Sequence, residues 1–202
     1  MSLALPEKHL DIDHELDEAL DPSSSKVTRK IVFAAAGNNK GGNSPRSWPA
    51  RKSNVIAIHA TDGLGSSVNI NPTPKGEWCF ATLGHGIEHR AYGTDGEDGD
   101  ALYVSGTSFA TPIAAGIAAN IMEYARHHVP DLNEDRKKRL YSAPGMRAIF
   151  KAMSEERGGY YYVQPWTFWA EKMRGGHWEN QDLEPGDPDN VGLALKSIIA
   201  ET

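Results

Sequence analysis

The chain has 202 residues, a formal net charge of −6, and hydrophobic residues at 39% of its positions. This length allows one domain with a sizeable core, and an acidic balance without a basic stripe argues against nucleic-acid binding. No stretch reaches the roughly 18 apolar residues of a membrane span, and the single cysteine, Cys79, excludes an internal disulfide. The amino terminus lacks a positively charged segment followed by an apolar run, which predicts no signal peptide and an intracellular protein.

The predicted elements alternate between helices and strands. Leucine spacing predicts an amphipathic surface helix over residues 8–20, and a second helix is predicted over 108–127. Four apolar runs predict strands, at 31–36, 54–60, 79–83 and 101–104. The first two have the continuous apolar character of strands buried on both faces. Together they predict an α/β fold with a largely parallel sheet and helices on both faces.

The region after Pro130 is predicted to be helical and rich in aromatic residues. We expect a domain over residues 1–128 and a helical, aromatic extension over 129–202. Three helices are predicted in the extension, at 136–141, 144–153 and 191–200. The aromatic runs at 160–163 and 166–169 indicate either a partner-binding patch or rings that pack on the core.

The segment Ser105–Pro112 precedes a helix rich in Ile, Ala and Gly, and it places Ser108 in the first turn. A serine at this place is commonly a helix cap. Gly106, however, permits close approach of another backbone, and small or apolar side chains over 110–119 predict a helix buried on every side. The positive end of the helix dipole then faces whatever lies in front of Ser108, as it does for a nucleophile.

Asn38 follows the apolar run at 31–36 directly after Gly37. Sites in open α/β sheets form at the carboxyl ends of strands, so an amide at this position is well placed to donate to an oxyanion. The alternative is that Asn38 merely adopts a left-handed turn conformation. Its pairing with the Ser108 segment favours the oxyanion role.

Two motifs carry a resemblance to a known family. Gly106-Thr107-Ser108-Phe109-Ala110-Thr111-Pro112 resembles the nucleophile motif of the subtilisin-like serine proteases (subtilases), and Ile31–Asn38 resembles the segment that supplies their oxyanion-hole asparagine. Met1-Ser2-Leu3 resembles, more weakly, the strand that lines the substrate cleft, with Ala4 and Leu5 in place of the usual glycines. The resemblance covers residues 1–128.

The resemblance implies a serine endopeptidase that acts on peptide or protein substrates without a cofactor or metal. Ser108 would be the nucleophile, and Asn38 with the Ser108 backbone N–H would hold the oxyanion. The residues implied to contact substrate are Ser2, Leu3, Ala4 and Gly37. The acidic, glycine-rich loop at 93–100 lacks the spacing of a calcium loop and is predicted to be a solvated turn.

The rest of the triad is not recognisable in the sequence. In subtilisin the aspartate and the histidine precede the serine, in the order Asp, His, Ser. The residues before Asn38 contain no Asp-Thr/Ser-Gly or His-Gly-Thr segment. The resemblance therefore implies the C-terminal half of an N-terminally truncated domain, with the missing half, or a larger multidomain chain, as its partner. Secretion stays open on this interpretation, because an export signal belongs to the preceding half.

No histidine of this chain is predicted to replace the missing base. His14 lies on the predicted surface helix, and His59 ends a strand. His85 comes after the asparagine, and His127 and His128 close the second helix, where imidazolium suits the negative dipole end.

Without a base, Ser108 is a poor nucleophile, so the isolated chain is expected to be inactive. Two alternatives remain at this point. The first is a catalytically dead subtilase-like module that binds peptides or partners. The second is an unrelated α/β binding domain in which Ser108 only caps a helix.

Overall fold

The computed structural model describes residue 8 and residues 10–20, 30–38, 45–76, 78–92, 98–129, 131–166 and 188–201. The helices are α1 (Leu10–Leu20), α2 (Thr107–His128), α3 (Glu134–Leu140), α4 (Ala143–Ala152) and α6 (Pro188–Glu201). The strands are β1 (Phe33–Ala35), β2 (Ile56–Thr61), β3 (Phe80–Leu83), β4 (Ile87–Tyr92), β5 (Asp98–Val104), β6 (Ser154–Arg157) and β7 (Tyr160–Val163). Within these ranges, no helix has the length and apolar character needed to cross a bilayer.

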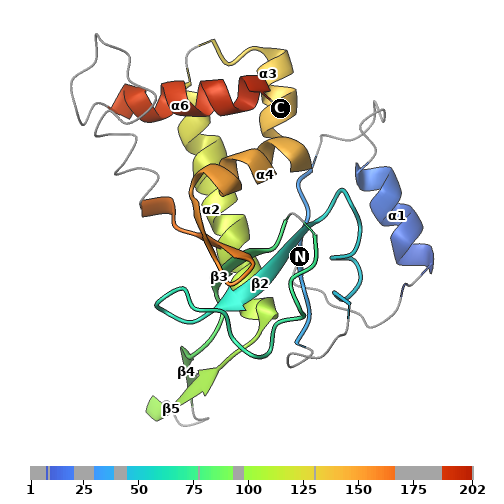
Figure 1. Ribbon diagram of the computed structural model, residues 1–202, viewed down its shortest axis with the longest axis vertical. Helices are drawn as coiled ribbons and strands as arrows, with labels where there is room; N and C mark the ends of the chain where they lie inside the picture. Colours follow the sequence, from blue (N-terminus) through green and yellow to red (C-terminus); the bar gives the residue numbers. More distant parts are fainter. Residues whose placement is uncertain are drawn as a thin grey trace.

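A five-stranded sheet forms the centre of the fold, in the order β1-β2-β3-β7-β6 (Figure 1). Strands β1, β2, β3 and β7 run parallel, and the edge strand β6 pairs antiparallel with β7. Strands β4 and β5 form a separate antiparallel hairpin that projects from the lower end of the molecule in Figure 1. The α/β class and the largely parallel sheet predicted from the sequence are confirmed.

Two strands were missed because they lack an apolar run. The sequence of β6 is Ser-Glu-Glu-Arg, with its two glutamates exposed at the edge of the sheet, and β4 is similarly polar. The aromatic run at 160–163 is itself a strand, because β7 pairs with β3. Residues 154–163 therefore share one sheet with β1 to β3, and the predicted boundary at residue 128 stays a prediction.

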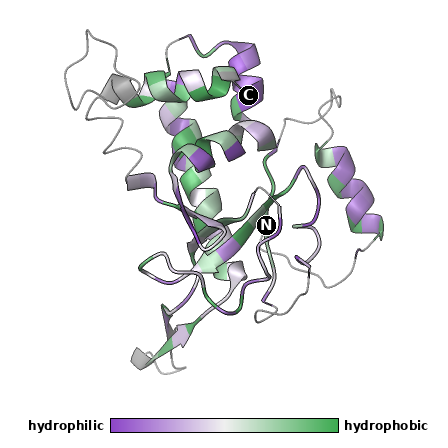
Figure 2. Ribbon diagram, in the orientation of Figure 1, coloured by the Kyte–Doolittle hydropathy of each residue, from purple (hydrophilic) through white to green (hydrophobic). Residues whose placement is uncertain are grey.

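Helices cover both faces of the sheet. On one face, Phe33, Ile58 and Phe80 pack in a single core with α2, α4 and α6. On the other face, Ala34 and Ala57 pack with side chains of α1. Figure 2 shows mostly hydrophobic residues along β2, whereas α1 is mostly hydrophilic. The predicted arrangement of helices on both faces is confirmed.

Helix α2 is not buried on every side, contrary to the expectation from its composition. Its buried alanines, Ala110, Ala114 and Ala118, face the sheet. On another side, Phe109 is 40% exposed and Ile113 is 37% exposed. Small residues allow a helix to be enclosed but do not require it, because burial depends on which elements lie against each side.

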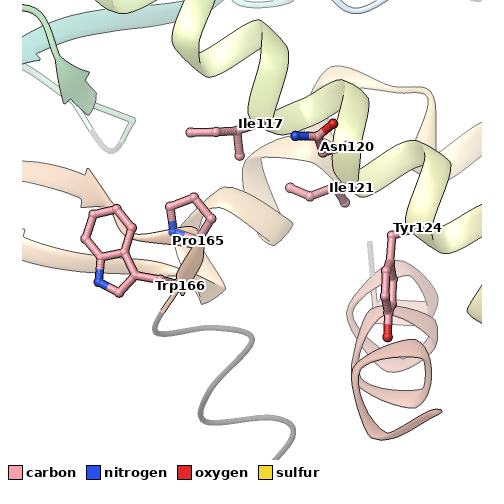
Figure 3. A pocket seen from close by; sticks show the side chains of 6 residues that line it. All are labelled: Ile117, Asn120, Ile121, Tyr124, Pro165 and Trp166. Carbon is pink, nitrogen blue, oxygen red and sulfur yellow. The ribbon is translucent and has the colours of Figure 1, made fainter. Parts of the chain in front are cut away.

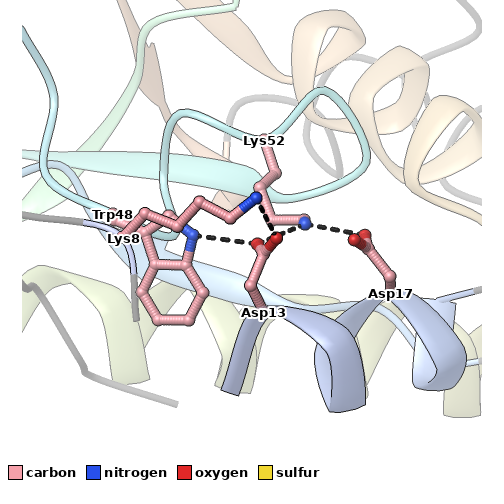
Figure 4. Close-up of polar contacts among 5 residues, drawn as sticks. All are labelled: Lys8, Asp13, Asp17, Trp48 and Lys52. Carbon is pink, nitrogen blue, oxygen red and sulfur yellow. Dashed lines mark hydrogen bonds and ion pairs between the residues drawn. The ribbon is translucent and has the colours of Figure 1, made fainter. Parts of the chain in front are cut away.

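Helix α1 is attached by a polar anchor (Figure 4). The buried Asp13 carboxylate accepts a hydrogen bond from the Trp48 indole at 3.1 Å and ion pairs with Lys52 and Lys8, each at 2.6 Å. Lys52 also pairs with Asp17 one turn further along the helix, at 2.7 Å. The hydrogen bonds from Lys52 and Lys8 hold the pKa of Asp13 well below its usual range.

Candidate active site

The candidate site begins where β1 ends. The strand ends at Ala35, and Gly37 then adopts a φ of +114°, which glycine tolerates far better than other residues. The left-handed turn therefore belongs to Gly37 rather than to Asn38, since Asp131 is the one non-glycine with positive φ in the described ranges. Asn38 follows with an exposed side chain.

Thr107, the first residue of α2, fixes the orientation of the Asn38 side chain. Its hydroxyl accepts from the Gly37 backbone N–H at 3.1 Å and donates to Asn38 Oδ1 at 3.1 Å. Its own backbone N–H donates to the same Oδ1 at 2.9 Å. Because the carbonyl oxygen is held by two donors, the amide nitrogen Nδ2 is turned away from Thr107, as a preorganised oxyanion donor requires.

Ser108 lies in the first turn of α2, one residue after Thr107, and is partly buried. The N-cap of this helix is Gly106, and it makes no side-chain cap hydrogen bond. Ser108 is therefore not the N-cap residue of α2. Backbone N–H groups in the first turn of a helix point along its axis, towards the region in front of the serine.

Close packing beneath the helix start accounts for two glycines. A Cβ on Gly84 would lie 2.7 Å from the Ala60 Cβ and 2.9 Å from the Gly106 carbonyl oxygen. The Gly106 N–H donates to the Gly84 carbonyl at 2.8 Å, which ties the loop after β3 to the start of α2. A Cβ on Gly106 would lie 3.3 Å from Asn38 Nδ2, so glycine also leaves room for the amide.

Four of the described histidines each contact a partner other than Ser108. These contacts are His59 to the Phe80 carbonyl, His85 to the Ser105 hydroxyl, His127 to the Glu123 carboxylate and His128 to the ring of Tyr124. His14 lies exposed on α1, as predicted. His127 and His128 end α2, also as predicted.

His59 is the histidine with the largest electrostatic perturbation. Its ring is fully buried, and its Nδ1–H donates to the Phe80 carbonyl at 3.1 Å. Burial, and then the charge of Arg46, lower the pKa of His59 to about 3, so the ring is neutral near pH 7. An imidazole enclosed in the core in this way is a packing residue.

The remaining predicted site residues are placed as follows. Ser2, Leu3 and Ala4 lie outside the described residues, so their role in substrate binding stays a prediction. Gly37 is buried, and its role in substrate binding also stays a prediction. Within the described ranges, no group of three or more His, Cys, Asp or Glu side chains has the arrangement of a metal site.

The described aromatic residues after β6 divide between the core and the surface, and residues 167–169 of the second aromatic run lie outside the described residues. Tyr160 and Tyr162 are buried, whereas Trp166 is 59% exposed. Trp166 and Pro165 face Ile117 and Tyr124 of α2 across a largely apolar pocket of about 360 Å³ (Figure 3). The rings at 160–162 thus pack in the fold, and the tryptophan lies at the rim of a pocket.

Sequence reasoning missed Thr107 and Gly84 as parts of the site. The sequence placed Thr107 inside the nucleophile motif, but its partners Gly37 and Asn38 are about 70 positions away. Gly84 had no local signal beyond being a glycine after a strand. Both roles arise from contacts between elements.

The geometry defines a subtilisin-like α/β domain: a parallel sheet in which an asparagine after one strand is held against the first turn of a serine-bearing helix. Comparison with known proteins agrees with this class. The chain belongs to the subtilase family, whose sequence profile (peptidase S8) matches residues 1–151. The family is one of serine proteases, as the two sequence motifs implied.

The individual proteins that the chain resembles are also named as proteases. The chain is 29% identical, over 160 residues, to the subtilisin-like protease het-Q2 of Podospora anserina, covering 72% of this chain and 42% of that protein. Among solved structures it resembles a mutant of the protease domain of PatA, with 21% identity and a TM-score of 0.53, covering 80% of this chain and 55% of that one. It also matches the prenylagaramide maturation protease PagA, with 19% identity and a TM-score of 0.48, covering 98% of this chain and 59% of that one. The chain thus spans less than two thirds of each of these proteins.

Proposed function

We propose that this chain supplies the nucleophile and the oxyanion hole of a serine endopeptidase. Ser108 Oγ attacks the carbonyl carbon of a peptide bond, and its proton passes to a general base. The tetrahedral oxyanion accepts hydrogen bonds from Asn38 Nδ2 and from the Ser108 backbone N–H. The base returns this proton to the leaving nitrogen as the intermediate collapses, which expels the amine and leaves an acyl group on Ser108. Water then hydrolyses this ester and releases the acid.

The observation that carries this proposal is the Thr107 clamp on Asn38. Two donors from Thr107 hold Oδ1, and the Gly37 N–H holds the Thr107 hydroxyl in turn. An amide fixed in this way needs no reorganisation when charge develops on the substrate oxygen, which is the physical basis of oxyanion stabilisation. A purely structural turn after β1 does not need an orienting partner on a distant helix.

We place the general base and its orienting carboxylate outside this chain's 202 residues. His59 is enclosed in the core with a pKa of about 3, and His85 is engaged with Ser105. The proposed substrates are peptides or proteins, bound along the segment that includes Ser2, Leu3 and Ala4, in an intracellular setting. By itself the chain is expected to retain at most the residual acceleration of about 10³–10⁴ over water that an oxyanion hole and substrate binding provide in subtilisin.

The test is to sequence the transcript upstream of the Met1 codon and to express the whole reading frame. Peptide hydrolysis is then measured with quenched fluorescent substrates for that protein and for its Ser108→Ala and Asn38→Ala variants. We expect Ser108→Ala to abolish turnover and Asn38→Ala to lower kcat by about 10²–10³, the loss found for an oxyanion-hole donor in subtilisin. Ser66→Ala, at an exposed loop serine, is the matched control and should keep full activity.

Two results would contradict the proposal. One is turnover by the longer protein that survives Ser108→Ala. The other is a reading frame that begins at Met1 and yields a folded protein that binds peptides but never cleaves them, which would assign a binding module in place of a protease. Rapid turnover by the 202-residue chain alone would contradict the placement of the base outside it.

A further inference from the structure

A cavity of about 280 Å³ lies between the loop before β2 and the segment before β3. Five of the described side chains that line it are basic, namely Arg46, Arg51, Lys52, Lys75 and Arg147. No carboxylate belongs to the described lining. The cavity lining is therefore basic, although the chain as a whole has a formal net charge of −6.

Two of these side chains are held rigidly by backbone carbonyls. Arg46 donates through its Nη2 to the carbonyls of Lys75 and Trp78, at 3.0 and 3.2 Å. Arg147, on α4, donates through its Nη2 to the carbonyls of Ser53 and Val55. These contacts use part of each planar guanidinium and fix its position at the wall of the cavity.

Each of the two guanidinium groups also has an unused donor. The Nε atoms of Arg46 and Arg147 are both buried and have no hydrogen-bond partner. A buried N–H without an acceptor costs free energy, and more so when the group is charged. Burial lowers the pKa of Arg147, and repulsion by the neighbouring Arg46 cation lowers it further.

Lys52, one of the basic lining residues, has carboxylate partners for its ammonium group. It pairs with Asp13 and Asp17 of α1, at 2.6 and 2.7 Å (Figure 4). Arg46 and Arg147 have carbonyl and sulfur acceptors in the described structure and no carboxylate partner there. Within the described residues, therefore, no carboxylate offsets the charge of these two arginines.

We propose that this cavity is a binding site for a compact polyvalent oxyanion, such as a diphosphate or a small polycarboxylate. Such an anion offsets the positive charge of Arg46 and Arg147 at the cavity wall, and it relieves the repulsion between the two cations. Guanidinium groups suit these ligands because their planar N–H donors match the spacing of phosphoryl and carboxylate oxygens.

The proposed anion site is separate from the candidate active site. The lining residues Val55 and Trp78 precede β2 and β3, so the cavity lies towards the amino ends of these parallel strands. Asn38 follows the carboxyl end of β1. Occupation of the cavity is thus independent of whether Ser108 acts as a nucleophile.

The test is isothermal titration calorimetry of the full chain with inorganic pyrophosphate and, separately, with citrate, at two sodium chloride concentrations. We expect saturable 1:1 binding that weakens as ionic strength rises. Tighter binding of pyrophosphate assigns a phosphoryl ligand, and tighter binding of citrate assigns a carboxylate ligand. Absence of saturable binding with both anions would overturn the proposal.

Variants locate the site. Arg147→Gln should weaken binding by about tenfold or more, the loss expected for one charge-assisted hydrogen bond. Arg126→Gln removes the same charge from an exposed position on α2 and should leave the affinity unchanged. If Arg147→Gln fails to fold, Lys75→Gln, at an exposed lining residue, takes its place. Equal weakening by the lining variant and by Arg126→Gln would overturn the proposal.

A last variant tests whether a carboxylate of the chain itself, that of Glu77, occupies the cavity in place of an external anion. Glu77 lies between lining residues Gly76 and Trp78 in the sequence and is outside the described residues. Binding by the unmodified chain supports the proposal whatever Glu77→Gln does. Binding that occurs only in Glu77→Gln would overturn it, because the chain's own carboxylate would then fill the cavity.

Discussion

Replacement of Thr107 by valine tests the clamp that orients Asn38. Valine has nearly the same shape as threonine but lacks the hydroxyl, and Thr107 is fully buried. The variant leaves the Gly37 N–H without its acceptor, which costs about 1–3 kcal/mol for a buried donor, and it loses the bond to Asn38 Oδ1, worth about 1 kcal/mol. We expect the free energy of unfolding to fall by about 2–4 kcal/mol.

Urea denaturation followed by circular dichroism measures this loss. With a slope of about 2 kcal/mol per molar urea, the midpoint should fall by about 1–2 M. Thr107→Ser is the matched control: it keeps the hydroxyl and loses one buried methyl group, which costs about 1 kcal/mol. If Thr107→Val proves as stable as the unmodified chain, or no less stable than Thr107→Ser, the hydrogen-bonded clamp does not exist as described.

Three further predictions concern packing and charge. Gly84→Ala should cost about 1–3 kcal/mol by overpacking, measured as a urea midpoint, whereas Gly63→Ala should cost little because nothing lies within 4 Å of its added Cβ. The folded-state pKa of His59, about 3, lies below its ordinary value of 6.5, so its contribution to stability is complete above pH 6.5 and is lost as the pH falls towards 3. His59→Leu should remove one proton from the pH dependence of unfolding across that window, and an unchanged slope would refute a neutral buried ring. Asp13→Asn should increase amide hydrogen exchange along α1, while the exposed Asp11→Asn should not; equal effects would show that Asp13 does not anchor the helix.

The local signals in this sequence were sufficient for most elements of the fold. Apolar runs located β1, β2 and β3, because a strand covered on both faces must be apolar throughout. Leucine spacing located α1, and the Ser108 motif located the start of α2 to within one residue. The same motif and the Gly37-Asn38 pair identified the family without any structure.

The two polar strands, β4 and β6, could not be predicted from apolar runs. β6 is an edge strand and β4 belongs to an exposed hairpin, so neither has the apolar pattern that a buried strand requires. The exposed side of α2 also escaped prediction. A run of small residues is compatible with close packing on any side, and the neighbouring elements decide where that packing occurs.

The sequence by itself determined which residues we propose to carry the chemistry, because nucleophile and oxyanion motifs are local and depend on residue type. Tertiary structure decided what holds them: Thr107 clamps an amide about 70 positions away, and Gly84 lets the loop after β3 meet the start of α2. It also brought Arg46 and Arg147 to one cavity from segments with no shared pattern. Such contacts join positions far apart in the chain, and their spacing is set by the parallel sheet rather than by any local run of residues.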